Sequence, residues 1–373
     1  MKVQNRLAEL RAARGLSAAE LATAIDVSRQ TVYAMESGVY TPNTTVALKL
    51  ARTLRVTVEE VFQLDAQAAS PLMDQAELLD EGHAAAPGTP VSLCRVDGRL
   101  IATFPEPGTW SLPHADAVIA PAAGKPLRPS KTAVELFAPP LDFDKRLLMA
   151  GCDPGTSILA RHLGQQGVNL VVAHRNSTKA LALLHDGSIH VAGCHIRDER
   201  TEESNLAASG GIFRKQDIAV VSLALWEEGL VVARGNPKQI RIIADLERSD
   251  VTIVNRERGA GSRLLLDARL RSQGIPHGRL HGYESIAAGH LPAARRVQAG
   301  EADCCVAVAS AARILGLGFI PLVSERYDLV VHRRHLQLPQ VQALFNTLAL
   351  AAYRRELEHL GGYDTSVTGH RVI

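Results

Sequence analysis

The feature that most constrains the fold is the stretch Val251–Leu270, where an apolar run, a glycine-rich turn and a second apolar run follow one another. The first run is rich in β-branched residues, as in a buried strand, and the second continues at helical length. Gly259 and Gly261 permit a tight turn between them. We expect Ser262 to cap the helix and, with Arg263, to form an anion-binding site at its N-terminus. The alternative is a plain strand-to-helix turn with a capping serine and solvated arginines.

Length and composition place the chain among multidomain globular proteins. It has 373 residues, of which 46% are apolar and 21% charged, so two or three domains are expected. The five cysteines include no Cys-x-x-Cys pair, which argues against a disulfide framework or a zinc ribbon. No N-terminal signal core and no bilayer-length apolar run is present, so we predict a cytoplasmic protein.

Charge is unevenly distributed. Residues 1–58 carry eight Lys and Arg against four Asp and Glu, although the net charge of the whole chain is only +2. A basic N-terminal segment is what a DNA-binding domain needs.

Residues 1–65 are predicted to form a compact helical domain. Ser17 and Glu20 make a capping box ahead of one helix, and Ser28 caps the next, which Gly38 ends. Two short helices joined by a tight turn, the second with polar residues at its start, are typical of a helix-turn-helix. The alternative is a small helical bundle used for protein contacts.

Residues 16–22 (LSAAELA), 27–38 (VSRQTVYAMESG) and 47–51 (ALKLA) resemble the lambda-repressor/Cro-like family of DNA-binding domains. The resemblance implies that Arg29 and Gln30 contact base edges and that Tyr33 reaches a thymine methyl or a phosphate. It also implies that Ser28 and Thr31 contact phosphates. The expected partner is a double-stranded DNA operator with two-fold symmetry, bound by a homodimer.

Residues 66–145 are predicted to be a linker followed by a small β module. We expect one acidic helix over 74–81, a hairpin over 91–104 with an Asp97-Gly98 turn, and short strands at 117–120 and 133–137. No residue here suggests a particular chemistry.

From residue 146 to 373, apolar strands alternate with helices, which predicts a mostly parallel, doubly wound sheet. Ligands in such sheets bind beyond the carboxyl ends of the strands. Asp153, Thr156, Ser157 and Ser177 follow strands in this way. Two further apolar stretches, 218–237 and 326–331, are expected to cross between two lobes.

Several segments resemble the periplasmic-binding-protein-like domain of the molybdate-binding type found in one-component regulators. They are 151–154 (GCDP), 190–195 (HVAGCH), 226–238 (WEEGLVVARGNPK), 255–263 (NRERGAGSR), 282–284 (GYE) and 325–329 (ERYDL). The resemblance implies a two-lobed, type II ligand-binding domain over 146–373. One departure is Gly289-His290, where the family has a Thr-His pair; this removes a hydroxyl contact.

The predicted ligand site combines neutral donors from both lobes with one cation, as a tetrahedral oxyanion requires. The donors are Thr156, Ser157 and Ser177 in one lobe and Ser262 and Arg263 in the other, with Asp153, His195, Tyr283 and His290 as further contacts. No metal site is predicted, because the spacing of His185, His190 and His195 fits neither one helix face nor one strand face.

These expectations combine into one function: a DNA-binding transcriptional regulator whose sensor domain closes on a small oxyanion, molybdate or tungstate. An organic carboxylate or a molybdenum-cofactor-related metabolite is the alternative ligand. Enzymatic activity is disfavoured because no nucleophile elbow, P-loop or dinucleotide fingerprint is present. A binding protein for solute uptake is disfavoured because the chain also has a predicted DNA-binding domain. Apart from the oxyanion, no cofactor is expected.

Overall fold

The computed structural model describes residues 3–64, 72–79, 86–104, 114–121, 131–138, 142–195 and 212–372. Its contacts divide the chain into two compact units, Met1–Pro71 and Leu72–Ile373. Within the described residues, no helix is long and apolar enough to cross a bilayer. The predicted domain boundaries at 65 and 145 stay predictions.

The first unit is a helical bundle whose two ends are joined by a small antiparallel sheet between β1 and β2. Leu21, Ile25, Val32 and Leu50 are fully buried in its core. Its elements are β1 Val3–Asn5, α1 Leu7–Ala13, α2 Ala18–Ile25, α3 Arg29–Glu36, α4 Thr44–Leu54, α5 Val58–Val61 and β2 Phe62–Leu64.

Local capping explains where these helices begin. The hydroxyl of Ser17 accepts from the backbone N–H of Glu20, whose carboxylate accepts in return from the Ser17 N–H. The hydroxyl of Ser28 accepts from the Thr31 N–H at 3.0 Å. Both predicted caps are confirmed.

The second unit begins with a closed barrel in the order β3-β5-β4-β6-β7. The expected hairpin is confirmed, as β4 pairs antiparallel with β5. The helix expected over 74–81 is wrong: residues 72–78 form β3, whose Ala76 faces the barrel core while its neighbours pair with β7 and β5. The barrel strands are β3 Leu72–Leu78, β4 Pro90–Val96, β5 Arg99–Thr103, β6 Ala117–Ile119 and β7 Lys131–Leu136.

The barrel packs on the first lobe of an α/β domain. Cys94, Val96 and Ile101 share one buried cluster with Leu148 and Ala150, and Arg146 forms a bidentate ion pair with Asp116. In that lobe β8 pairs parallel with both β9 and β10 as predicted. The sheet as a whole is mixed and not mostly parallel, because the later strands of the sheet pair antiparallel. The first elements of the lobe are β8 Leu147–Gly151, α6 Thr156–Gln165, β9 Leu170–His174, α7 Ser177–His185 and β10 Val191–Cys194.

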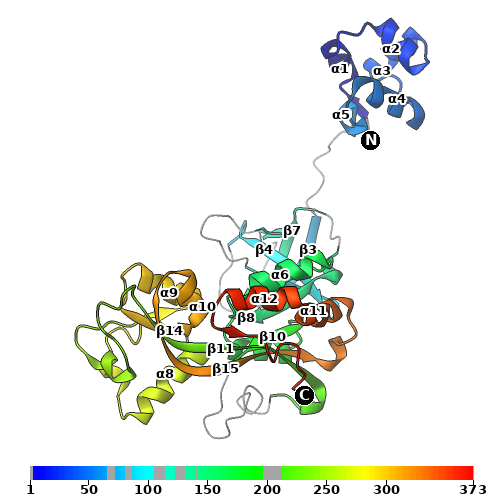
Figure 1. Cartoon of the computed structure of the whole chain (residues 1–373). Helices are drawn as coiled ribbons and strands as arrows, with labels where there is room; N and C mark the ends of the chain where they lie inside the picture. The colour runs from blue at the N-terminus through cyan, green and yellow to red at the C-terminus, as the bar shows by residue number, and fades with distance from the viewer. Residues whose placement is uncertain are drawn as a thin grey trace. The chain divides into compact units, whose positions relative to one another are not determined.

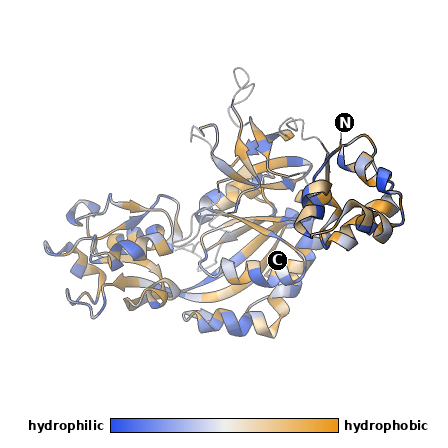
Figure 2. Ribbon diagram, turned by 90° about the horizontal axis from the view of Figure 1, so that it is seen from above, coloured by the Kyte–Doolittle hydropathy of each residue, from blue (hydrophilic) through white to orange (hydrophobic). Residues whose placement is uncertain are grey.

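Two long antiparallel strands, β11 Ile218–Val232 and β15 Gly318–His332, run from this sheet into the second lobe (Figure 1). They are the predicted crossings between the lobes. With them, the strand order of the sheet is β14-β11-β15-β10-β8-β9, and β16 pairs with β11. Figure 2 shows the sheet strands largely in orange, as buried strands require.

The second lobe lies between these crossings in sequence. It contains β12 Asn255–Arg256, α8 Gly261–Ser272, β13 Ile286–Ala287, α9 His290–Gln298, β14 Cys304–Val308 and α10 Ala309–Ile314. After β15 the chain returns to the first lobe as α11 Pro339–Ala349, α12 Ala351–His359 and β16 Tyr363–Asp364.

Candidate functional site

The candidate DNA-contacting residues gather on the solvent face of α3. Ser28, Arg29, Gln30 and Tyr33 are exposed and Thr31 is half-buried, while Val32 and Met35 on the opposite face are buried. The guanidinium of Arg29 donates to the Tyr33 hydroxyl at 2.9 Å, and the hydroxyls of Ser28 and Thr31 lie 2.8 Å apart. Helical spacing places Arg29, Gln30 and Tyr33 on one accessible surface, with Ser28 and Thr31 at the start of the helix. Their roles in DNA binding stay predictions.

In the second unit, several predicted ligand residues form hydrogen bonds within the protein. The Thr156 hydroxyl donates to the Asp153 carbonyl, and the Ser177 hydroxyl accepts from the His195 N–H at 3.1 Å. Ser262 donates to the Glu228 carboxylate, and Ser157 is exposed. Ser262 is not the expected cap, because α8 has Ala260 at its N-cap position and no side-chain cap.

Arg263 and Tyr283, two further predicted ligand residues, also contact neighbouring residues of the protein. The Arg263 guanidinium donates to the carbonyl of Arg256 at 3.2 Å and lies over the Tyr283 ring, 4.8 Å from its centroid. The Tyr283 hydroxyl donates to Asp267 at 2.6 Å. These two side chains support the loop that carries Arg256.

A different group of side chains meets where the lobes join. Cys152 follows β8, His195 follows β10, and His290 begins α9 in the second lobe. The Cys152 sulfur lies 3.5 Å from Nε2 of His195 and 3.6 Å from Nε2 of His290. All three side chains are buried, at 8%, 1% and 1% exposure.

The crossing strands add two carboxylates to this group. Nδ1 of His195 lies 3.0 Å from Glu325 on β15 and 3.6 Å from Glu228 on β11. Nδ1 of His290 lies 3.8 Å from Glu228. The register of β11 against β15 shifts between Glu228 and Gly229, so the carboxylate lies at an irregularity in the crossing.

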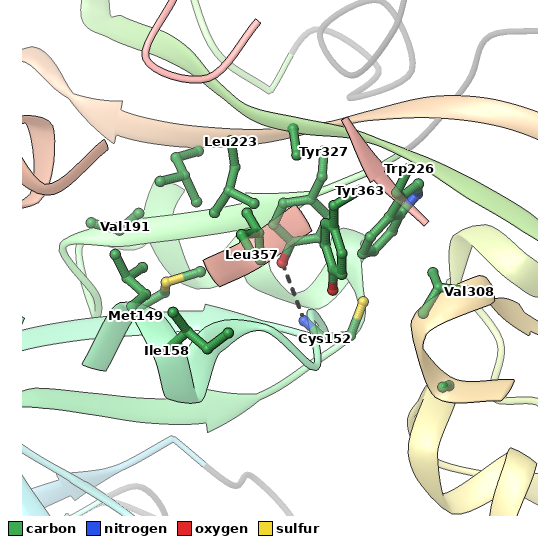
Figure 3. Close-up of a cluster of buried hydrophobic side chains, with 14 of the residues drawn as sticks. Met149, Cys152, Ile158, Val191, Leu223, Trp226, Val308, Tyr327, Leu357 and Tyr363 are labelled. Atoms are coloured by element: carbon green, nitrogen blue, oxygen red, sulfur yellow. Dashed lines mark hydrogen bonds between the residues drawn. The ribbon is translucent and has the colours of Figure 1, made fainter. Parts of the chain in front are cut away.

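Aromatic side chains enclose the first-lobe part of the group. The backbone N–H of Cys152 donates to the Tyr327 hydroxyl at 3.3 Å, and Figure 3 shows Cys152 beside Tyr327 and Tyr363 with Trp226 close by. The Tyr363 hydroxyl donates to Asp153 at 2.5 Å. The ring of Trp226 meets His195 edge-on, with centroids 4.7 Å apart. These contacts fix the position of the cluster within the first lobe.

Arg256 contributes a buried cation. Its side chain is 1% exposed, and Nε and Nη2 donate to Glu257 at 3.0 and 3.2 Å. Among the described residues, Nη1 has no hydrogen-bond partner. A buried donor without a partner is costly, so this atom marks a place for an acceptor from outside the chain.

Arg256 faces a small cavity between the lobes. The cavity has a volume of about 110 Å³, and its lining includes Cys152, Asp153, Arg256, Gly289 and His290. Sites for drug-sized ligands have about 300–1,000 Å³, so this one suits a small ion. Gly289 has φ of 114°, a conformation that glycine adopts readily and threonine only with strain.

Burial and neighbouring charges shift the pKa values of the two imidazoles in opposite directions. Burial opposes a charge on His195, but the carboxylate of Glu228 and then Cys152 outweigh it and raise its pKa well above the ordinary value. Burial and then the Arg256 guanidinium lower the pKa of His290 well below it. Burial, followed by the Glu325 carboxylate, raises the pKa of Glu228 to about 7.

The lobes also touch across the mouth of the cleft. The Asn176 amide donates to the Arg258 carbonyl at 3.2 Å, and the Thr178 hydroxyl donates to the Gly259 carbonyl at 3.1 Å. A Cβ on Gly261 would lie 2.6 Å from Nδ1 of His195. The glycine turn therefore allows the start of α8 to approach the first lobe closely.

The structure thus brings together Asp153, His195 and His290 from the predicted set, and it adds Cys152, Glu228, Arg256 and Glu325. Each added residue lies within a segment that carries the resemblance. Cys152 directly follows an apolar run and Arg256 lies two residues after one, the signal that selected Asp153.

Fold and site together define a helix-turn-helix domain joined to a two-lobed domain with a small interlobe cavity. Residues 7–61 match the helix-turn-helix family, and residues 160–349 match the PBP superfamily domain. The chain belongs to the PBP superfamily, with an N-terminal helix-turn-helix of the XRE type. These matches do not distinguish a molybdate-binding subtype.

The chain is also similar to individual proteins over each of these parts. The chain is 32% identical to the uncharacterized protein YvgK of Bacillus subtilis over 228 residues, 61% of this chain and 73% of YvgK. Over 63 residues it is 40% identical to the uncharacterized HTH-type transcriptional regulator YgzD of Bacillus subtilis, covering 17% of this chain and 96% of YgzD. The sulfate-binding protein SubI of Mycobacterium tuberculosis aligns with 59% of this chain and 86% of its own, at 14% identity and a TM-score of 0.43.

Proposed function

We propose that the chain is a DNA-binding transcriptional regulator, without enzymatic activity, that responds to a small oxyanion bound between its lobes. The observation that carries this proposal is Nη1 of Arg256, a buried cationic donor without a partner among the described residues, at a cavity of about 110 Å³. Molybdate and tungstate are the first candidates for the ligand. An organic carboxylate is the second, because a guanidinium binds carboxylates equally well.

Binding at this position favours the closed arrangement of the lobes. An anion between Arg256 and the first lobe adds a charge-assisted contact that the open arrangement lacks. Such a ligand can change DNA affinity by about 1–3 kcal/mol of coupling. We further propose that the regulator acts as a homodimer, since a single helix-turn-helix contacts only one half-site.

Calorimetric titration of the full chain with molybdate, tungstate, sulfate, phosphate and a dicarboxylate tests the ligand class. We expect at least one oxyanion to bind, and Arg256→Gln to weaken it about 10–100-fold, which is about 1.5–3 kcal/mol for a charged hydrogen bond. Arg258→Gln is the matched control, because Arg258 is exposed in the same loop. Binding that is unaffected by Arg256→Gln, or heat with none of the anions, would contradict the proposal.

The DNA-binding part is tested on an operator selected in vitro from random duplexes. Gln30→Ala should weaken operator binding by about 1–3 kcal/mol, the value of one bidentate base contact. Binding to unrelated DNA should keep its affinity and salt dependence, because phosphate contacts provide it. Equal losses on both DNAs in fluorescence anisotropy would contradict base contact by Gln30.

A further inference from the structure

The cluster of Cys152, His195 and His290 brings three potential metal-binding atoms together. The sulfur and the two Nε2 atoms face one another from three separate elements, and all three side chains are buried. These atoms are metal ligands in proteins when the thiol is deprotonated and the imidazoles are neutral.

The two imidazoles are held differently. Nδ1 of His195 lies 3.0 Å from Glu325, whereas Nδ1 of His290 lies 3.8 Å from Glu228 and has no hydrogen-bond partner among the described residues. A metal ion binds the neutral imidazoles through the lone pairs of Nε2 and the Cys152 sulfur as a thiolate, so binding releases protons.

The distances fit such a cation. A tetrahedral ion bound at about 2.3 Å to sulfur and about 2.0 Å to nitrogen holds these two atoms about 3.5 Å apart. The observed sulfur-to-nitrogen separations are 3.5 and 3.6 Å. Both sulfur-to-nitrogen separations therefore already match those around a bound ion.

We propose that Cys152, His195 and His290 bind a zinc-like d-block cation through one thiolate and two imidazole Nε2 atoms. One thiolate and two imidazoles suit Zn²⁺ or Cu⁺ and not Mg²⁺ or Ca²⁺, which prefer oxygen ligands. Three protein ligands leave a fourth position open. Cys152 and His290 also line the interlobe cavity, so this position faces the place of the proposed anion.

The carboxylates complete the arrangement as positioning residues. A metal-bound histidine usually donates its other N–H to a carboxylate, which fixes the tautomer and makes the ring a better ligand. Glu325 has this relation to His195. A second possible set of metal ligands, His195 with Glu228 and Glu325, would use Nδ1 of His195 instead and contains no sulfur. A signal from thiolate coordination therefore distinguishes the two sets.

The test is a Co²⁺ titration of the full chain after dialysis against a chelator, with Cu⁺ titrated in parallel against a chromophoric chelator. We expect one equivalent of Co²⁺, a near-ultraviolet thiolate-to-cobalt band, visible bands of tetrahedral type, and displacement by Zn²⁺. Cys152→Ser should remove the thiolate band and Cys152-dependent Cu⁺ binding. Cys94→Ser is the matched control, because Cys94 is also a buried free cysteine but lies in the barrel. Glu325→Gln should weaken binding about 10–100-fold while keeping the band.

X-ray absorption of the wild-type zinc form makes the result independent of how the variants fold. It should show one sulfur at about 2.3 Å and two imidazole nitrogens at about 2.0 Å. A thiolate band that survives Cys152→Ser, oxygen and nitrogen ligands alone, or no Cys152-dependent binding of either metal would overturn the inference. None of these measurements uses DNA or an anion, so they fail or succeed separately from the proposed function.

Discussion

The helix-turn-helix and the interlobe cluster are built in opposite ways. In the first unit, Ser17, Ser28 and Thr57 each cap a helix through an N–H three residues away. In the second, Cys152 meets His290 across 138 residues and His195 meets Glu325 across 130. A locally encoded surface can be recognised from a short motif, whereas a site at the junction of two lobes exists only when distant segments are packed together.

The largest expected effect tests whether the two units of the chain unfold independently of one another. Leu21 is fully buried in the core of the first unit, so Leu21→Ala should destabilise that unit by about 2–5 kcal/mol. In scanning calorimetry of the full chain, one transition should move down and the transition of the second unit should stay. Thr23→Ala on the exposed side of α2 is the control, and a shift of both transitions by Leu21→Ala would contradict separate units.

Acid should affect the two regions differently. The buried His190 accepts from the Leu148 N–H at 3.0 Å, and burial followed by the charge of His335 lowers its pKa to about 4. Between pH 6.5 and 4 the unfolded state binds a proton that the folded state does not, so stability falls as the pH falls. The expected loss is about 3 kcal/mol for the second unit.

His190→Asn keeps an acceptor near the Leu148 N–H and removes this titration. Denaturant unfolding of the variant at pH 7 and pH 4.5 should show a weaker pH dependence than the wild type. Residues 1–71 contain no histidine, so the first unit provides an internal reference. If the stability of the second unit depends on pH as strongly in the variant as in the wild type, His190 is not the source of that dependence.

A smaller effect tests the close approach of the lobes. A Cβ on Gly261 would lie 2.6 Å from Nδ1 of His195 and 2.5 Å from its carbonyl oxygen. Gly261→Ala should therefore disfavour closure by about 1–3 kcal/mol and weaken a ligand held between the lobes, as measured by calorimetry. Gly278→Ala is the matched control because no atom lies within 4 Å of its Cβ. Equal affinities for the two variants would show that closure does not require this contact.

Sequence patterns predicted much of the architecture. The capping residues of α2 and α3, the hairpin over 91–104, the parallel strands β8 to β10 and the two crossing strands agree with the structure. The acidic helix expected over 74–81 does not, because residues 72–78 form β3, whose pairing with β5 and β7 outweighs the helical preference of its residues. Ser262 was expected at a helix cap, and it instead reaches Glu228 in the crossing strand.

The sequence by itself determined the helix-turn-helix and the two-lobed class, since caps, glycine turns and apolar periodicity act within a few residues. Only the tertiary structure decided which side chains meet at the cleft. Cys152, His195, Glu228, Arg256, His290 and Glu325 lie in different segments. Their separations of a few ångströms are set by how β11 and β15 join the lobes, a long-range packing that no local pattern specifies.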